Sequence, residues 1–359
     1  MNIFVAIMLF FAALGLLDEI LGGRLGLAAE FEKGLTTMGS LALSTIGFYC
    51  IGVAAVQANA EAIAAAAKNM PFDSSLLIGC LLAPDMGALP IALKLASSQA
   101  LGIFTGALVA GGLGMTVGFQ LPVFLAAVQK QEVGELMRGF IYGLITLPVG
   151  LLTGGFLLGL PVITLLLNMI PVFLLCVVLI IAFLLVPDGT MKVLTAFGVG
   201  IRILSFILFG IVIFGVFAPQ WAMVDQELVY EMLYLIIRMV IVACGGLVIS
   251  KLALQYFSAP IDVLGKHLGI NRQAVIGLIL SCTQSLAMLP LFSQMDRKGK
   301  ILNAAFSVSG AYLVGGQMAF TATLIPPSAV PAYMINKAVA GALAVLLASL
   351  FERVTASEK

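Results

Sequence analysis

The sequence predicts an all-α polytopic membrane protein with an inverted repeat, about nine spanning helices and two re-entrant or interrupted hairpins. Its composition is the first observation: of 359 residues, 62% are hydrophobic and 10% are charged. A soluble domain is about 45–50% apolar and about 25% charged. The second observation is that many apolar runs approach the roughly 20 residues that a helix needs to cross a bilayer. The third is that two interrupted runs resemble each other.

Apolar runs bounded by charged or turn residues predict the spanning helices. They cover roughly 3–22, 36–56, 100–128, 139–160, 162–186, 193–217, 229–254, 301–323 and 331–351. The first run has no basic segment before it and no clear cleavage site, so we interpret it as a spanning helix rather than a signal peptide. The segments 58–72 and 258–271 are more polar, and 58–72 is typical of an interfacial helix. The two interrupted runs are 75–95 and 273–292.

An internal repeat relates the two halves of the chain. Gly79 and Pro90 in the first interrupted run correspond to Gly277 and Pro290 in the second. Each half then has the order helix, helix, polar segment, interrupted segment, helix, helix. The predicted organisation is a first repeat at 1–161 with its hairpin at 75–95, a linker helix at 162–186, and a second repeat at 187–359 with its hairpin at 273–292.

Charge topology favours hairpins over complete crossings at both interrupted runs. If both runs enter and leave on one side, 13 lysines and arginines share a side. Lys68, Lys94 and Lys337 then lie on the other side. If both runs cross, the same charges divide eight to eight. The positive-inside rule therefore predicts oppositely oriented repeats, an external N-terminus and a cytoplasmic C-terminus.

Paired interrupted helices of this kind are typical of transporters, whose substrate sites lie near the middle of the membrane. Each half-helix has about 10 residues and reaches about 15 Å, half of the hydrocarbon core. The predicted tips are Ala83–Gly87 and Ser281–Ser285, which approach each other from opposite sides. We therefore expect alternating access around a site between the tips.

Asp85 is the strongest candidate for a binding residue. It stands between Pro84, which ends a helix, and Gly87, which permits an unusual turn. A carboxylate at this depth costs roughly 2.5–3.5 kcal/mol on insertion scales and needs a cation or hydrogen-bond donors. Two interpretations follow: a ligand for a cationic substrate or coupling ion, or a cap on the backbone amides of the hairpin.

Uncharged polar residues provide further candidates. Thr283, Gln284 and Ser285 at the second tip can bind a polar substrate or cap the backbone. Gln120 and Gln317 lie inside predicted spans, where they can line a cavity or join helices by hydrogen bonds. The neighbouring Gly315-Gly316 pair predicts close helix packing.

Other function classes have little support. Eighteen basic residues balance 17 acidic ones, so a nucleic-acid partner is not expected. The sequence contains no H-E-x-x-H, G-x-S-x-G or P-loop motif, and its five cysteines form no C-x-x-C pair. We therefore expect no enzyme activity, no metal site and no cofactor. A non-transporting membrane scaffold or sensor is an alternative, although the short loops offer partners little surface.

Several sequence blocks resemble the ethanolamine utilization membrane protein family, the ethanolamine permeases of bacterial ethanolamine operons. The resemblance covers nearly the whole chain. It is densest in the blocks at 31–47, 79–87, 168–172 and 265–312. It implies uptake of ethanolamine across the bacterial inner membrane into a cytoplasmic ammonia-lyase pathway. The bilayer and this small molecule are then the expected partners, and homo-oligomer formation stays open.

The resemblance also implies roles for individual residues. Asp85 and Met86 match the Asp-Met-Gly motif of the family, so Asp85 is expected to bind the ammonium group. The hydroxyl group is then left to Thr283, Gln284 or Gln317. The chain departs from the family pattern in two places: Thr283-Gln284 replaces an Asn-Asn pair, and Gly316-Gln317 replaces an Asp-His pair. An ion-coupled carrier of another small polar solute is therefore the alternative within transport.

Overall fold

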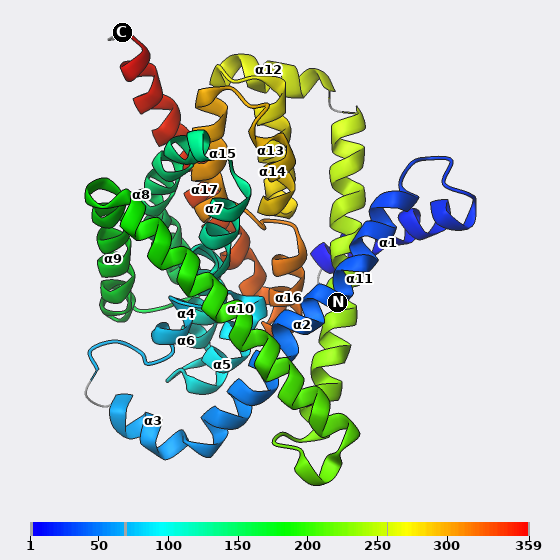
Figure 1. Cartoon of the computed structure of the whole chain (residues 1–359), viewed down its shortest axis with the longest axis vertical. Coiled ribbons are helices and arrows are strands. Elements are labelled where there is room, and N and C mark those ends of the chain that lie inside the picture. Colours follow the sequence, from blue (N-terminus) through cyan, green and yellow to red (C-terminus); the bar gives the residue numbers. More distant parts are fainter. Residues whose placement is uncertain (1–2, 68–69, 257, 358–359) are drawn as a thin grey trace.

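The computed structural model describes residues 3–67, 70–256 and 258–357, and these residues form helices and connecting turns without a strand (Figure 1). Among them, seven helices are long and apolar enough to cross a membrane. They are Ala28–Val56, Gln99–Ala127, Lys130–Leu157, Val162–Leu185, Pro187–Phe217, Gln226–Leu252 and Pro327–Glu352. The predicted all-helical, multi-pass class is therefore confirmed.

The first part of the chain alternates long helices with short pieces. In chain order these are α1 (Ile3–Ile20), α2 (Ala28–Ala58), α3 (Ala60–Ala67), α4 (Leu76–Gly79), η1 (Pro84–Met86), α5 (Ala88–Leu95), α6 (Gln99–Ile103), η2 (Phe104–Gly114), η3 (Thr116–Gln120), α7 (Leu121–Ala127), η4 (Lys130–Glu132) and α8 (Val133–Leu157). Both η2 and η3 are π-helical. The π form is rare, usually a single turn, and is frequently found at functional sites. The predicted 100–128 span is thus a buried helix with a π-helical middle.

The rest of the chain has the same mixture. It comprises α9 (Val162–Leu185), α10 (Pro187–Phe217), η5 (Pro219–Trp221), α11 (Gln226–Tyr256), α12 (Ser258–Leu268), α13 (Arg272–Thr283), η6 (Ser285–Met288), α14 (Leu289–Phe292), α15 (Arg297–Ser309), α16 (Gly316–Leu324), η7 (Pro327–Ala329) and α17 (Val330–Ser357). The short apolar pieces α4, α5, α13 and α14 occupy the two predicted interrupted runs.

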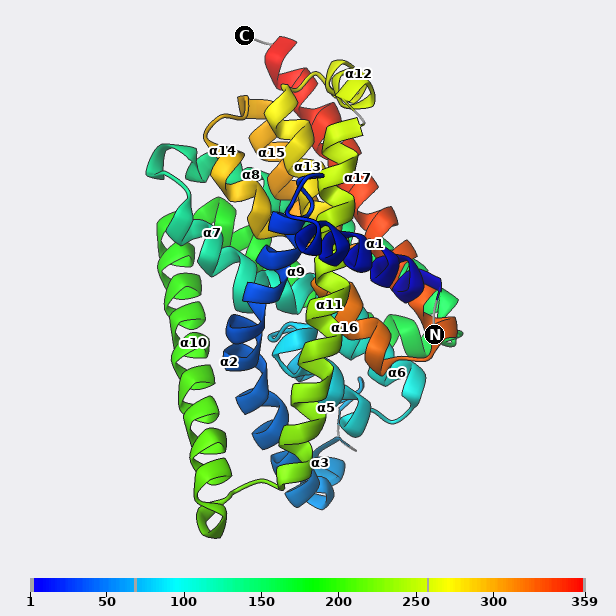
Figure 2. The same ribbon diagram turned by 90° about the vertical axis from the view of Figure 1, so that its right-hand side faces the viewer.

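Two of the nine expected spans differ from the prediction. The expectation of a continuous helix at 301–323 is wrong, because α15 ends at Ser309 and α16 begins at Gly316. The first helix, α1, is not among the seven candidate spans, and it crosses α11 at a steep angle (Figure 2). Its backbone approaches α11 closely at Gly245, where an added Cβ would lie 2.0 Å from the Met8 carbonyl oxygen. Lys68 lies outside the described residues.

The two polar segments lie at opposite ends of the molecule. Helix α3 is at the lower end and α12 is at the upper end, in both views (Figures 1 and 2). The interrupted segments follow the same division, with α4 and α5 in the lower half and α13 and α14 in the upper half. Each interrupted segment therefore extends toward the middle from its own end.

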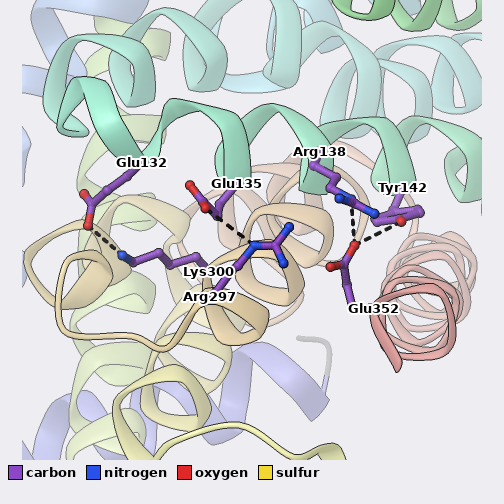
Figure 3. A network of polar contacts seen from close by, with 7 residues as sticks. All are labelled: Glu132, Glu135, Arg138, Tyr142, Arg297, Lys300 and Glu352. Carbon is purple, nitrogen blue, oxygen red and sulfur yellow. Dashed lines mark hydrogen bonds and ion pairs between the residues drawn. The ribbon is translucent and has the colours of Figure 1, made fainter. Parts of the chain in front are cut away.

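Charged side chains join η4 and α8 to α15 and α17 (Figure 3). Lys300 Nζ lies 2.7 Å from Glu132 Oε1, and Arg138 Nε lies 2.7 Å from Glu352 Oε1. The Tyr142 hydroxyl also donates to Glu352 Oε1, over 3.2 Å. These contacts fix the ends of three helices whose other turns surround the middle of the molecule.

Candidate functional site

The first interrupted segment places Asp85 in a break between two short helices. Helix α4 ends at Gly79, and a 3₁₀ turn starts at Pro84. Gly87 then adopts a φ of 96°, a left-handed conformation that residues with a Cβ rarely adopt. Its geometry starts α5 in a new direction immediately after Asp85 and Met86. The predicted tip at Ala83–Gly87 is therefore a true break in the helix.

The second interrupted segment breaks at Gln284, whose backbone is extended between α13 and η6. The link between α15 and α16 lies against this end of α13. There the Tyr312 amide donates to the Ser281 carbonyl and the Val314 amide donates to the Cys282 carbonyl, each over 3.0 Å. Gly315 therefore permits a close backbone contact with the end of α13, and Gly316 at the start of α16 lies beside Ala243 of α11. A Cβ on Gly315 would lie 1.6 Å from the Thr283 carbonyl oxygen.

Tyr312 occupies an unusual conformation at this contact. Among the described residues, Tyr312 is the one non-glycine residue with a positive φ, which is 62°. Such a conformation costs of order 1–3 kcal/mol and is often found at functional sites. The Tyr312 hydroxyl accepts a hydrogen bond from Ser285 Oγ over 2.9 Å. The break in the α15–α16 helix thus directs an aromatic hydroxyl toward the second tip.

Gln120 links the π-helical segment to the same tip. Its Nε2 donates to Ser285 Oγ over 2.7 Å and to the Ser307 carbonyl over 3.0 Å. Both Gln120 and Ser285 are buried. These bonds place Gln120 and Ser285 in one network, and they show that Gln120 joins elements from both halves of the chain.

A second polar cluster surrounds Asp85. The Tyr333 hydroxyl lies within donating distance of Gln317 Oε1, at 3.1 Å, and of the Tyr312 carbonyl, at 3.2 Å. Asp85 has the Gln317 side chain as a hydrogen-bonding neighbour and interacts electrostatically with Lys337. Asp85 Oδ1 and Gln317 Nε2 are both buried and have no hydrogen-bond partner among the described residues. One acceptor and one donor therefore lie near each other, and neither has a hydrogen-bond partner at full bonding distance among the residues described.

Lys337 is the principal residue that the sequence reasoning misplaced. We expected it at the outer surface, but it is 1% exposed and lies on α17. Its ammonium group donates to the Gly111 carbonyl in η2 and lies 5.8 Å from the centre of the Tyr333 ring. The available signal was its position inside an apolar run, where an ionisable residue usually has a function.

The remaining predicted residues lie at the edges of this cluster. Met86 is buried and packs with an apolar group that includes Phe48, Met115 and Tyr312. The Thr283 hydroxyl forms a 2.6 Å hydrogen bond with Ser250 on α11. Gln284 forms the extended link after α13. The structure therefore brings together Asp85, Gln120, Ser285 and Gln317 with three unpredicted residues, Tyr312, Tyr333 and Lys337.

The chemistry of this cluster suits binding of a small polar molecule. It combines one carboxylate, one ammonium group, two amides and two phenols. All except the half-buried Asp85 are at most 6% exposed. No group of three or more potential metal ligands occurs in the described part of the chain. A solute entering this site would meet hydrogen-bonding and charged groups supplied by η1, η2, α16 and α17.

Comparison with known proteins reveals related sequences along nearly the full chain. The family model described as "Ethanolamine utilisation protein, EutH" matches residues 1–351. A protein of Listeria monocytogenes named "Probable ethanolamine permease EutH" is 30% identical, over 96% of this chain and 92% of its own length. A Salmonella typhimurium protein of the same name is 26% identical over 97% of this chain and 95% of its own length.

A third relative, the "Uncharacterized protein YxeR" of Bacillus subtilis, is 27% identical over 96% of this chain and 93% of its own length. No solved structure matches the chain. The resemblance noted in the sequence blocks is confirmed by a family match that extends far beyond those blocks. This chain belongs to the ethanolamine utilisation protein EutH family.

Proposed function

We propose that this protein is a membrane transporter for ethanolamine and that it binds the protonated form of the molecule at Asp85. The observation that carries the proposal is that two neighbouring buried atoms, Asp85 Oδ1 and Gln317 Nε2, each lack a partner at full hydrogen-bond distance among the described residues. Protonated ethanolamine has an ammonium group that donates hydrogen bonds and a hydroxyl oxygen that accepts them. The two free atoms have the complementary functions, since a carboxylate accepts and an amide NH₂ donates.

The names of the bacterial relatives support the substrate class, because two of them are probable ethanolamine permeases. Permeases are transporters and not enzymes. The seven apolar helices support a multi-pass membrane location. The relatives and the site chemistry thus indicate the same class of molecule, a small solute that crosses a membrane.

Alternating access between two oppositely oriented repeats is the mechanism we propose. Its support is the placement of the two interrupted segments, which extend toward the middle from opposite ends of the molecule (Figures 1 and 2). Discontinuous helices at the middle of the membrane form the binding sites of many transporters with inverted repeats. Because Tyr312, Gln317 and Tyr333 are buried, movement of a tip is needed to admit a solute. We propose an external N-terminus and a cytoplasmic C-terminus, as the charge distribution favours.

The test is uptake of radiolabelled ethanolamine by liposomes that contain the purified protein, compared with Asp85→Asn. A hydrogen bond to a charged group is worth about 1.5–3 kcal/mol, so we expect the variant to lose about 10- to 100-fold in apparent affinity. Asp262→Asn is the matched control, since Asp262 is an exposed carboxylate on α12. Saturable uptake by the control and its loss in a folded Asp85→Asn protein support the proposal.

Two results would contradict it. If a folded Asp85→Asn protein takes up ethanolamine at the wild-type rate, Asp85 does not bind the substrate. A folded wild-type protein without saturable uptake would exclude ethanolamine as the substrate. In that case competition with other small amines and amino alcohols would identify the solute that the departures at Thr283-Gln284 and Gly316-Gln317 select.

A further inference from the structure

Lys337 is buried, Asp85 is half-buried with a buried Oδ1 atom, and these two opposite charges direct their hydrogen bonds elsewhere. The Lys337 ammonium group donates to the Gly111 carbonyl, while Asp85 Oδ1 has no hydrogen-bond partner among the described residues. The two residues nevertheless interact electrostatically. Lys337 therefore balances the charge of Asp85 and leaves one carboxylate oxygen available to another donor.

The charges around Lys337 limit what the site can hold. Asp85 is the charged residue with which it interacts, and Tyr333 on the same helix faces its ammonium group. Tyr312 is titratable and interacts with both Asp85 and Tyr333. The neighbouring elements η2 and α16 contribute the uncharged Gly111 and Gln317.

The ion pairs of α8 and α15, in contrast, join Arg138 to Glu352, Glu135 to Arg297 and Lys300 to Glu132 (Figure 3). Lys298 on α15 donates to the Leu268 carbonyl. A protonated lysine together with a cationic substrate would therefore give the buried site a net positive charge. An uncompensated charge in a low-dielectric interior is strongly unfavourable, and the group that can neutralise itself does so. Among the two cations, Lys337 is the one that stays with the protein.

We infer that Lys337 and the substrate ammonium group compete as the counter-ion of Asp85, so that each bound cation displaces one proton. This inference rests on the proposed function and defines its coupling. Lysine can perform this role because its amine loses a proton more readily when buried, whereas arginine keeps its charge.

The exchange has a balanced sequence of steps. When the substrate cation binds Asp85 from one side, an N–H bond of the Lys337 ammonium group breaks and the proton passes to water on that side. The loaded site then contains a carboxylate, a substrate cation and a neutral lysine. On the other side the substrate leaves and Lys337 takes up a proton from water there. The protein returns with Lys337 protonated.

The net result of one cycle is the inward movement of one substrate cation and the outward movement of one proton. No net charge crosses the membrane. The outcome is the same as permeation of the neutral amine, yet the protein recognises the protonated form, which is the abundant one at neutral and acidic pH. Transport is then driven by the substrate and proton gradients and is independent of the membrane potential.

The experiment measures protein-dependent ethanolamine uptake at neutral pH into liposomes with an imposed potassium potential set by valinomycin. A potential of about 100 mV, inside negative, would concentrate a freely carried monovalent cation about 50-fold. We expect no such accumulation by the wild-type protein. An inside-acid gradient of one pH unit should accelerate protein-dependent uptake toward a tenfold accumulation, measured above liposomes without protein.

Lys337→Met tests whether this lysine is the exchanging group. We expect the variant to respond to the membrane potential and to lose the acceleration by the pH gradient, because no lysine proton is available for exchange. Lys94→Met, which removes an exposed lysine at the end of α5, should behave like the wild type. Lys337→Arg retains a permanent charge, so we expect a folded protein with strongly reduced uptake.

The possible failures are distinguishable. Accumulation driven by the potential in the wild type would overturn the exchange while leaving the transporter function intact. If uptake by Lys337→Met is still independent of the membrane potential and is still accelerated by the pH gradient, Lys337 is not the exchanging group. If that variant does not fold, the wild-type voltage response and Lys337→Arg still decide the question. Absence of saturable uptake by the folded wild type would remove the proposed function and this inference with it.

Discussion

Lys337 on α17 donates a hydrogen bond to the carbonyl of Gly111 in the π-helical segment η2. A side chain at position 111 would crowd this contact. A Cβ there would lie 3.2 Å from Gln317 Oε1, 3.4 Å from Tyr333 Cε2 and 3.6 Å from Lys337 Cε. One glycine therefore borders three side chains of the proposed site.

Replacement of Gly111 with alanine should impair binding more than folding. The added methyl group crowds the Gln317 amide and the Tyr333 ring, so we expect the apparent affinity for substrate to fall several-fold. Substrate uptake over a range of concentrations measures the change. Gly210→Ala on α10 is the control, because an added Cβ there meets no atom within 4 Å. Equal affinity of the two variants would contradict the assignment of Gly111 to the site.

Replacement of Gly87 with alanine should destabilise the first tip. A residue with a Cβ in the left-handed region costs roughly 1–2 kcal/mol, and the Cβ would also lie 3.3 Å from Phe48 Cβ. Thermal unfolding in detergent should therefore show a lower midpoint. Gly26→Ala separates the two causes, since Gly26 has a φ of 70° with nothing within 4 Å of an added Cβ. The difference between the variants reports the packing of the tip against α2.

Replacement of Arg138 with glutamine should destabilise the end of the helix group in Figure 3. Glu352 is 3% exposed in its side chain, and Arg138 is its charged partner there. Removal of one partner of a fully buried ion pair costs about 3–5 kcal/mol. The cost here should be smaller, because Arg138 is 37% exposed and the Tyr142 hydroxyl also donates to Glu352. Arg272→Gln is the comparison, because Arg272 and Asp262 are 3.8 Å apart and both are 52% exposed. If Arg138→Gln and Arg272→Gln lower the free energy of unfolding equally, the ion pair of Arg138 is no more stabilising than the exposed one.

Asp73 should make the stability of the loop before α4 dependent on pH. Burial raises its pKa, but hydrogen bonds from Ser75 and Ser97 outweigh burial and hold the pKa below its ordinary value. The ionised form is therefore favoured in the folded protein. Its contribution is complete above about pH 4, the ordinary aspartate value, and is lost as the pH falls through the lower folded value.

The measurement is the thermal midpoint of the wild type and of Asp73→Asn at several pH values. The wild type should be more stable near neutral pH, and the difference should shrink in acid. A constant difference between wild type and Asp73→Asn would show that the hydrogen bonds do not favour the ionised form.

The sequence predicted those parts of the site that have a local signal. The first tip has a proline, a carboxylate and a glycine within an apolar run, and the structure breaks the helix there. Gln120 and Gln317 were identified because amides are conspicuous among apolar residues. Gln120 joins helices through hydrogen bonds, which is one of the two roles considered, while Gln317 also lies beside Asp85.

The residues that were missed depend on tertiary structure. The break at 310–315 follows from pairing with the end of α13, and no proline marks it. Tyr312 and Tyr333 look like ordinary apolar positions until the fold directs their hydroxyl groups inward. Lys337 lies near the start of the predicted span at 331–351, so it looked like a charge at a membrane boundary, but Gly111 and Tyr333 enclose its ammonium group. The burial of such a residue depends on the neighbouring elements that pack around it, which the local sequence does not show.

The pairing of Tyr312 and Val314 with the carbonyls of Ser281 and Cys282 has a mechanical consequence. The second tip and the break in the α15–α16 helix are linked through their backbones, and side-chain substitution does not remove these bonds. A displacement of α13 therefore pulls on Tyr312 directly and on Gln317 through the start of α16. Opening the second tip would change the position of the amide beside Asp85 in the same motion, so release of a solute and loss of its contacts become a single event.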